Sequence, residues 1–113
     1  MWVFLNNAFL SIIRPTARDA APPGHLLVRG RLPGDIERIF PHATVTETPS
    51  RDYRFRTLLP QEEVAAALAR AVEGIDYNNF KSSVKDSDRH DAYFDVWEAM
   101  ASAQAVARRR ERR

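Results

Sequence analysis

The fold is decided by residues 25–40, HLLVRGRLPGDIERIF, where a strand pattern is followed directly by a helix pattern. Side chains alternate with a period of two over residues 25–32, which is typical of a strand with one covered face. The next apolar residues, Ile36, Ile39 and Phe40, have the i, i+3, i+4 spacing of a short helix. This stretch therefore predicts a strand that leads into a helix.

Four further strands are predicted around this unit. Residues 2–5 and 8–13 are rich in β-branched and aromatic side chains. They predict a hairpin whose two central asparagines would take the positive φ of a type I′ turn. Residues 44–48 predict an edge strand that a turn joins to a strand over residues 53–59.

Helical patterns dominate the second half of the chain. A long helix is predicted from Pro60, followed by a short helical piece that ends at Val84. A final helix is expected after an N-cap at residues 86–88. The side chains expected to be buried are Val64, Leu68, Ala71, Val72 and Ile75 in the long helix, and Tyr93, Val96, Trp97 and Met100 in the final one.

This order of elements indicates an α+β fold, with an antiparallel sheet of four to five strands and helices on one face. Residues 25–75 match the βαββα run of a ferredoxin-like fold, and an N-terminal strand would complete it in permuted order. A different antiparallel sheet fits nearly as well. We expect one domain over residues 1–107, which ends in a C-terminal helical pair.

Charge is distributed in three blocks. Lys and Arg number 8 against 5 Asp and Glu in residues 1–60, 4 against 9 in residues 61–107, and 5 against 1 in residues 108–113. The last block, RRRERR, is predicted to be a disordered basic tail. The internal segment 14–24, with three of the seven prolines, is predicted to be a mobile loop.

The chain has no cysteine, which excludes disulfides and thiolate metal sites. This composition suits a reducing cytoplasm, so we expect a cytoplasmic protein. No apolar run approaches the roughly 18 residues of a membrane span.

Arginines alternate with apolar residues in two predicted strands. If helices cover the face with Val28, Tyr53 and Phe55, these arginines share the opposite face. Guanidinium groups bind phosphates and carboxylates, so this face suits nucleic acid or an acidic protein. Ordinary solvated outer positions explain the pattern equally well. The residues concerned are Arg29, Arg31, Arg54 and Arg56, with Trp2, Phe4 and Phe9 available for base stacking or for the core.

A second candidate surface lies in the acidic helical half. Aromatic side chains with charged neighbours are typical of protein-binding hot spots. Packing of the aromatics onto the core is the simpler interpretation. The residues of this surface are Tyr77, Phe80, Lys81, Asp91 and Asp95.

Catalytic patterns are weak. His90-Asp91 resembles the paired ligands of metal phosphohydrolases, but no wider ligand pattern accompanies it. No Gly-rich phosphate loop and no nucleophile context is present. We therefore expect no catalytic residue, no metal and no cofactor.

Several segments resemble a group of small uncharacterised bacterial proteins that open with an MWxFLNxAFLSI-like hairpin. These segments are residues 1–13, 26–41, 52–56, 75–86 and 89–100. The resemblance implies an accessory protein of mobile elements, such as an anti-CRISPR-like inhibitor of host defence, and it implies no activity or cofactor.

The sequence as a whole predicts a non-enzymatic binding protein. We expect it to occlude a protein or nucleoprotein partner by surface recognition. The alternative is an accessory protein that binds nucleic acid directly through the basic sheet face.

Overall fold

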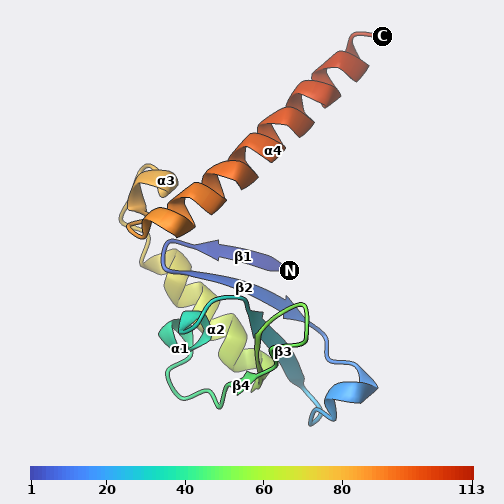
Figure 1. Cartoon of the computed structure of the whole chain (residues 1–113), viewed down its shortest axis with the longest axis vertical. Coiled ribbons are helices and arrows are strands. Elements are labelled where there is room, and N and C mark those ends of the chain that lie inside the picture. Colours follow the sequence, from blue (N-terminus) through green and yellow to red (C-terminus); the bar gives the residue numbers. More distant parts are fainter. The chain divides into compact units, whose positions relative to one another are not determined.

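The computed structural model describes residues 1–113 and divides them into two compact units, Met1–Asp76 and Tyr77–Arg113. The first unit contains a five-stranded sheet and two α-helices, and the second contains two further helices (Figure 1). The division after Asp76 differs from the single domain predicted for residues 1–107. Its physical basis is that α3 (Phe80–Ser83) packs on α4 (Ser87–Glu111).

All neighbouring strands of the sheet are antiparallel, in the order β1-β2-β3-β5-β4. The α+β prediction is therefore confirmed. The run from β3 to α2, with β2 beside β3, has the strand order of a permuted ferredoxin-like sheet, and β1 adds one more strand at the edge. The strands are β1 (Trp2–Leu5), β2 (Ala8–Ile13), β3 (His25–Gly30), β4 (Thr46–Glu47) and β5 (Phe55–Pro60).

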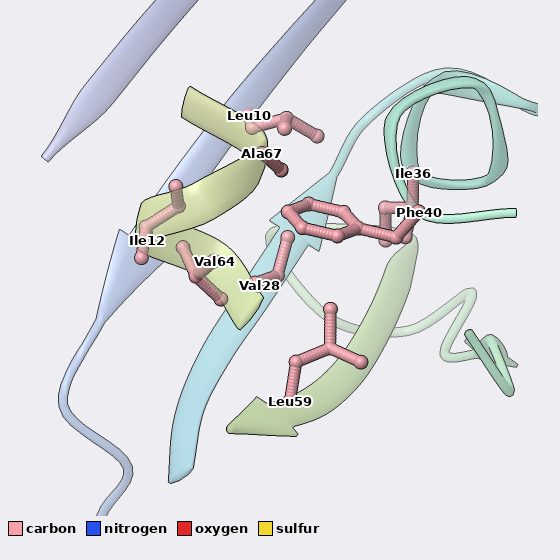
Figure 2. Packing of buried hydrophobic residues seen from close by; sticks show 8 residues of the cluster. All are labelled: Leu10, Ile12, Val28, Ile36, Phe40, Leu59, Val64 and Ala67. Atoms are coloured by element: carbon pink, nitrogen blue, oxygen red, sulfur yellow. The ribbon is translucent and has the colours of Figure 1, made fainter. Parts of the chain in front are cut away.

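Helices α1 (Asp35–Ile39) and α2 (Gln61–Glu73) pack on the same face of the sheet. Apolar side chains of both helices meet those of the three central strands there, because alternation turns every second strand residue toward them. Figure 2 shows this core, which consists of Leu10, Ile12, Val28, Ile36, Phe40, Leu59, Val64 and Ala67.

The hairpin between β1 and β2 forms at the predicted residues, but its turn is not type I′. Positive φ occurs only at Ala20, Gly24 and Gly34, so neither asparagine adopts it. Contacts with α1 hold this turn instead. The carbonyl of Asn7 accepts a hydrogen bond from Arg38 at 2.8 Å, and the Phe9 N–H donates to Asp35 at 3.0 Å.

Helix α2 buries fewer of its apolar side chains than predicted. Val64 and Ala67 are buried, whereas Val72 and Ile75 are exposed. Val72 lies about 80° around the helix from Val64, at the rim of the covered face. Ile75 follows the end of the helix at Gly74.

Side chains cap both helices of the second unit at their N-termini, and the cap of α4 lies at the predicted residues 86–88. The Asn79 side chain accepts a hydrogen bond from Ser82, and the Asp86 side chain accepts one from Arg89. Helix α4 then continues to Glu111, so most of the predicted disordered tail over 108–113 is helical.

Burial along α4 is also less than predicted. Tyr93 is buried, but Val96 is exposed, as are Trp97 at 53% and Met100 at 66%. The reason is the short length of α3, whose four residues reach only the first turns of α4.

Candidate functional site

The face of the sheet opposite α1 and α2, called the open face below, carries two of the four predicted arginines side by side. Arg29 on β3 is the register partner of Arg56 on β5. The neighbouring pair Val28 and Thr57 is buried on the helix side. Like charges directly opposite each other destabilise a sheet unless other groups compensate them.

Arg29 is held in place by its neighbours. Its Nη2 donates to the buried Ser11 hydroxyl at 2.8 Å, and its Cζ lies 4.3 Å from the centre of the Tyr53 ring. Its Nε is buried without a hydrogen-bond partner. The position of the Arg29 guanidinium is thus fixed by its neighbours, and its Nε–H has no hydrogen-bond partner.

The strand pattern predicted Tyr53 on the helix-covered face, and this prediction is wrong. It precedes the first residue of β5, Phe55, and its ring packs under the guanidinium groups of Arg29 and Arg31. Tyr53 is only 3% exposed, and Arg31 lies 4.1 Å from its ring centre. The chain bends at residues 51–54, so the alternation of β5 does not extend back to Tyr53.

Arg54 does not join the other predicted arginines. Its guanidinium forms an ion pair with Glu47 at 2.9 Å and lies 5.0 Å from the Phe55 ring centre. Glu47 belongs to the edge strand β4, where it is the register partner of Phe55, and the Phe55 side chain packs against the core. The charge of Arg54 is therefore compensated by Glu47 at this edge of the sheet.

Arg51, rather than the predicted Arg54, lies beside Arg56. It lines a cavity of about 550 Å³ together with Arg56, three threonines of the 44–48 segment and Asp19 of the 14–24 loop. Nothing in the strand periodicity marks Arg51 or Asp19, because both lie in connecting segments. Leu27, the apolar residue that broke the polar alternation of β3, is buried and lines the same cavity.

The cavity lining carries an excess of positive charge, with Arg51 and Arg56 against Asp19. Burial lowers the pKa of Arg56, and the positive charges of Arg51 and Arg29 lower it further. The pKa of Asp19 is lowered mainly by the hydrogen bond from the Thr16 backbone N–H, with a smaller contribution from Arg56. Asp19 is the only carboxylate that lines the cavity. Arg31, which does not line the cavity, forms an ion pair with the exposed Asp52 at 3.3 Å. We call Arg29, Arg31, Arg51 and Arg56 the arginine cluster.

Three aromatic side chains continue the open face beyond the arginine cluster. Phe9 and Ser11 are on this face of β2, because Leu10 between them is in the core. The Phe9 ring lies 4.7 Å from the Phe4 ring and 6.3 Å from the Trp2 ring, measured between centroids. Trp2, the register partner of Ser11, is 67% exposed. The aromatic cluster of Trp2, Phe4 and Phe9 thus adjoins Ser11, which binds Arg29.

The second predicted surface is partly internal to the second unit. Phe80 lies 5.8 Å from Tyr77 and stacks on the buried Tyr93 at 5.7 Å, so packing accounts for these aromatics. The Lys81 ammonium lies 4.3 Å from the Trp97 ring centre.

The two acidic residues of that surface are exposed on α4. Asp91 is 84% exposed, with an oxygen 3.6 Å from the His90 ring, and Asp95 is also exposed. No group of three or more His, Asp or Glu side chains is arranged to hold a metal ion. No helix combines the length and apolar character needed to cross a bilayer.

Searches against protein-family models, curated proteins and solved structures found no match to this chain. The resemblance to small bacterial proteins with a similar N-terminal hairpin therefore stays a prediction.

Proposed function

We propose that this chain is a non-enzymatic nucleic-acid-binding protein, which holds a single strand on the open face of its sheet. The arginine cluster would contact the phosphates, and the aromatic cluster would stack on the bases. This is the alternative function that the sequence left open. The arrangement of the open face favours it over a protein partner.

The observation that carries this proposal is the excess of positive charge around Arg56. Arg51 and Arg29 are close enough to Arg56 to disfavour its charged form, and Asp19 is the only carboxylate in the cavity lining. A bound phosphate would neutralise this repulsion and form charge-assisted hydrogen bonds with the guanidinium groups.

Aromatic side chains on the same face support a single strand over a duplex. Trp2 is mostly exposed and lies against Phe9, which leaves its ring available to a base. Bases of a single strand are free to stack on such rings, whereas those of a duplex are already stacked on each other. Each stacked base contributes about 1–3 kcal/mol in known single-strand sites.

The test is fluorescence anisotropy with a labelled single-stranded oligonucleotide and the matching duplex, over a series of salt concentrations. We expect the single strand to bind more tightly and its affinity to fall with salt. The double variant Arg51→Gln/Arg56→Gln should reduce the slope of log K against log salt by roughly 1.4, at about 0.7 per lost phosphate contact.

Arg70→Gln is the control for net charge and is compared with the single variant Arg56→Gln, because Arg70 is exposed on α2 and carries the same charge. Binding by this variant should resemble that of the unchanged protein. Equal loss in both variants would mean that net charge alone drives binding. Absence of binding at low salt would refute the proposal.

A second candidate, recognition of a protein partner, is favoured by the apolar side chains exposed on α4. Trp97 and Met100 are both more than half exposed, and Lys81 lies beside Trp97. Exposed aromatic residues with a charged neighbour are typical interface anchors. A host protein that is captured after nuclease treatment, retained by Arg56→Gln and lost with Trp97→Ala would support this candidate.

A further inference from the structure

Charged residues of opposite sign are placed symmetrically about Ser102 on one face of α4. Asp95 and Arg109 each lie seven residues from Ser102, and Asp91 and Arg113 each lie eleven residues from it. Seven and eleven residues are close to two and three helical turns, so all five residues share one face of the helix. Helix α4 ends at Glu111, and the backbone N–H of Arg113, two residues further on, donates to the Arg110 carbonyl, which keeps Arg113 close to the last turn.

This charged face is accessible to a partner. All five of its residues are exposed. The contacts that α3 makes with α4 involve Tyr93, Phe94 and Trp97, which point in other directions around the helix. The face is therefore not the one that α3 covers.

We infer that α4 pairs with the α4 of a second copy of this chain in an antiparallel arrangement, with the two-fold axis at Ser102. A two-fold axis there places Asp95 opposite Arg109 of the second copy and Asp91 opposite Arg113 of the second copy. The same two pairs form again on the other side of the axis, since a two-fold interface is self-complementary. A parallel pair would instead bring like charges together.

Small residues lie beside the axis, and Glu98 and Val106 flank them on the same face, four residues from Ser102. Ala99, Ser102 and Ala105 have small side chains, and each of them is exposed. The interface thus has charged residues at both ends and small residues beside the axis. Salt screens exposed ion pairs, so this dimer should weaken as ionic strength rises.

Disulfide trapping tests the orientation directly, because the full chain contains no cysteine of its own. We expect Ser102→Cys to form a covalent dimer under mild oxidation at low salt, since the two Ser102 positions meet at the axis. Asp88→Cys, fourteen residues away along the helix, should not link to itself. Linking of Asp88→Cys, or of neither variant, would overturn the inference.

Charge exchange tests the pairing by sedimentation velocity. Asp91→Arg/Asp95→Arg and Arg109→Asp/Arg113→Asp should each be monomeric at 50 mM salt, while an equimolar mixture of the two should restore the dimer. Glu62→Arg/Glu63→Arg, at exposed positions of α2, is the control that should still dimerise. Either α4 variant remaining dimeric by itself would contradict the inference.

The dimer is argued from residues of α4 alone and the proposed nucleic-acid binding from residues of the first unit alone, so the two proposals are tested separately. Arg51→Gln/Arg56→Gln should therefore dimerise like the unchanged chain. The two variants of α4 should still bind an oligonucleotide as single chains, so failure of one proposal leaves the other open to its own test.

Discussion

Arg56 combines a stability cost with a binding role. Its guanidinium is partly buried and repelled by Arg51 and Arg29, and burial is the largest cause of its lowered pKa. Replacing it with a neutral residue removes a charge that is unfavourable in the free protein. Residues that are kept despite such a cost are often those that bind a ligand.

We predict that Arg56→Gln stabilises the free protein while it weakens binding. Urea denaturation should show a gain of up to about 1 kcal/mol at low salt. The gain should shrink at 0.5 M salt, because salt screens the repulsion that the substitution removes. Arg54→Gln should show no such gain, since Arg54 is neutralised by Glu47. A loss of stability in Arg56→Gln would contradict this account of the arginine cluster.

Tyr53 is the second residue at which a local contact supports the site. Two guanidinium groups lie 4.3 Å and 4.1 Å from its ring centre, and the ring is buried. Each cation–π contact of this kind is worth about 0.5–2 kcal/mol. The ring therefore helps to hold Arg29 and Arg31 where the proposed ligand would meet them.

Tyr53→Leu should lower the free energy of unfolding by about 2 kcal/mol, because it removes the ring from both contacts. Tyr53→Phe keeps the ring and should lose less than about 1 kcal/mol. The comparison is made by urea denaturation followed by tryptophan fluorescence. Equal losses in the two variants would show that the ring contacts contribute little.

Among the elements, the strands of the first unit follow from the sequence because alternation and covered faces coincide there. The ends of β2, β3 and α1 lie within two residues of the predicted bounds. Hydrophobic periodicity predicts burial wrongly where the sequence does not show which element covers an apolar residue. Trp97 and Met100 have helical spacing, yet α3 is too short to reach Met100.

The candidate site was predictable only where it lies in strands. Arg29 and Arg56 share the open face, as alternation requires. Tyr53, Arg51 and Asp19 lie in turns and loops, where side-chain direction has no period and depends on long-range packing. The strand pattern therefore identified three members of the arginine cluster, Arg29, Arg31 and Arg56. It missed Arg51 and assigned Arg54 to the cluster in error.

Close packing of α1 on the sheet depends on Gly30, the last residue of β3. A Cβ at this position would lie 3.3 Å from Cγ1 of Ile36 and 3.8 Å from Cβ of Asp35, both of which are fully buried side chains. Since Asp35 also binds the turn of the β1–β2 hairpin, a shift of α1 would disturb that turn as well.

Gly30→Ala is therefore expected to destabilise the protein by about 1–3 kcal/mol through overpacking. Gly24→Ala provides the comparison, because a Cβ there meets nothing within 4 Å and only the positive φ of Gly24 opposes it. That backbone strain costs about 1–2 kcal/mol. Thermal denaturation measures both losses, and amide NMR separates the two mechanisms, since only Gly30→Ala should also shift the amide resonance of Phe9. An unshifted Phe9 amide would show that α1 does not move.

For the whole molecule, the division after Asp76 separates a unit with its own core from one without. Every residue of the buried cluster in Figure 2 belongs to the first unit. The second unit has 37 residues by its bounds, and its only buried apolar residues are Val84 and Tyr93. Chains below about 40 residues rarely bury enough apolar surface to fold without a disulfide, a metal or a partner.

We predict that residues 1–76 fold as an isolated chain, with a cooperative thermal transition and dispersed amide resonances. Residues 77–113 alone should lose most of their helical circular dichroism at low concentration, because helices in proteins are stabilised mainly by packing of an apolar face and this unit buries only two apolar residues, Val84 and Tyr93. Helicity that rises with the concentration of this fragment would show α4 acquiring a partner from a second copy. A disordered 1–76 chain would mean that the sheet and its two helices do not provide a sufficient core, and the assignment of the binding surface to that unit would then lose its physical basis.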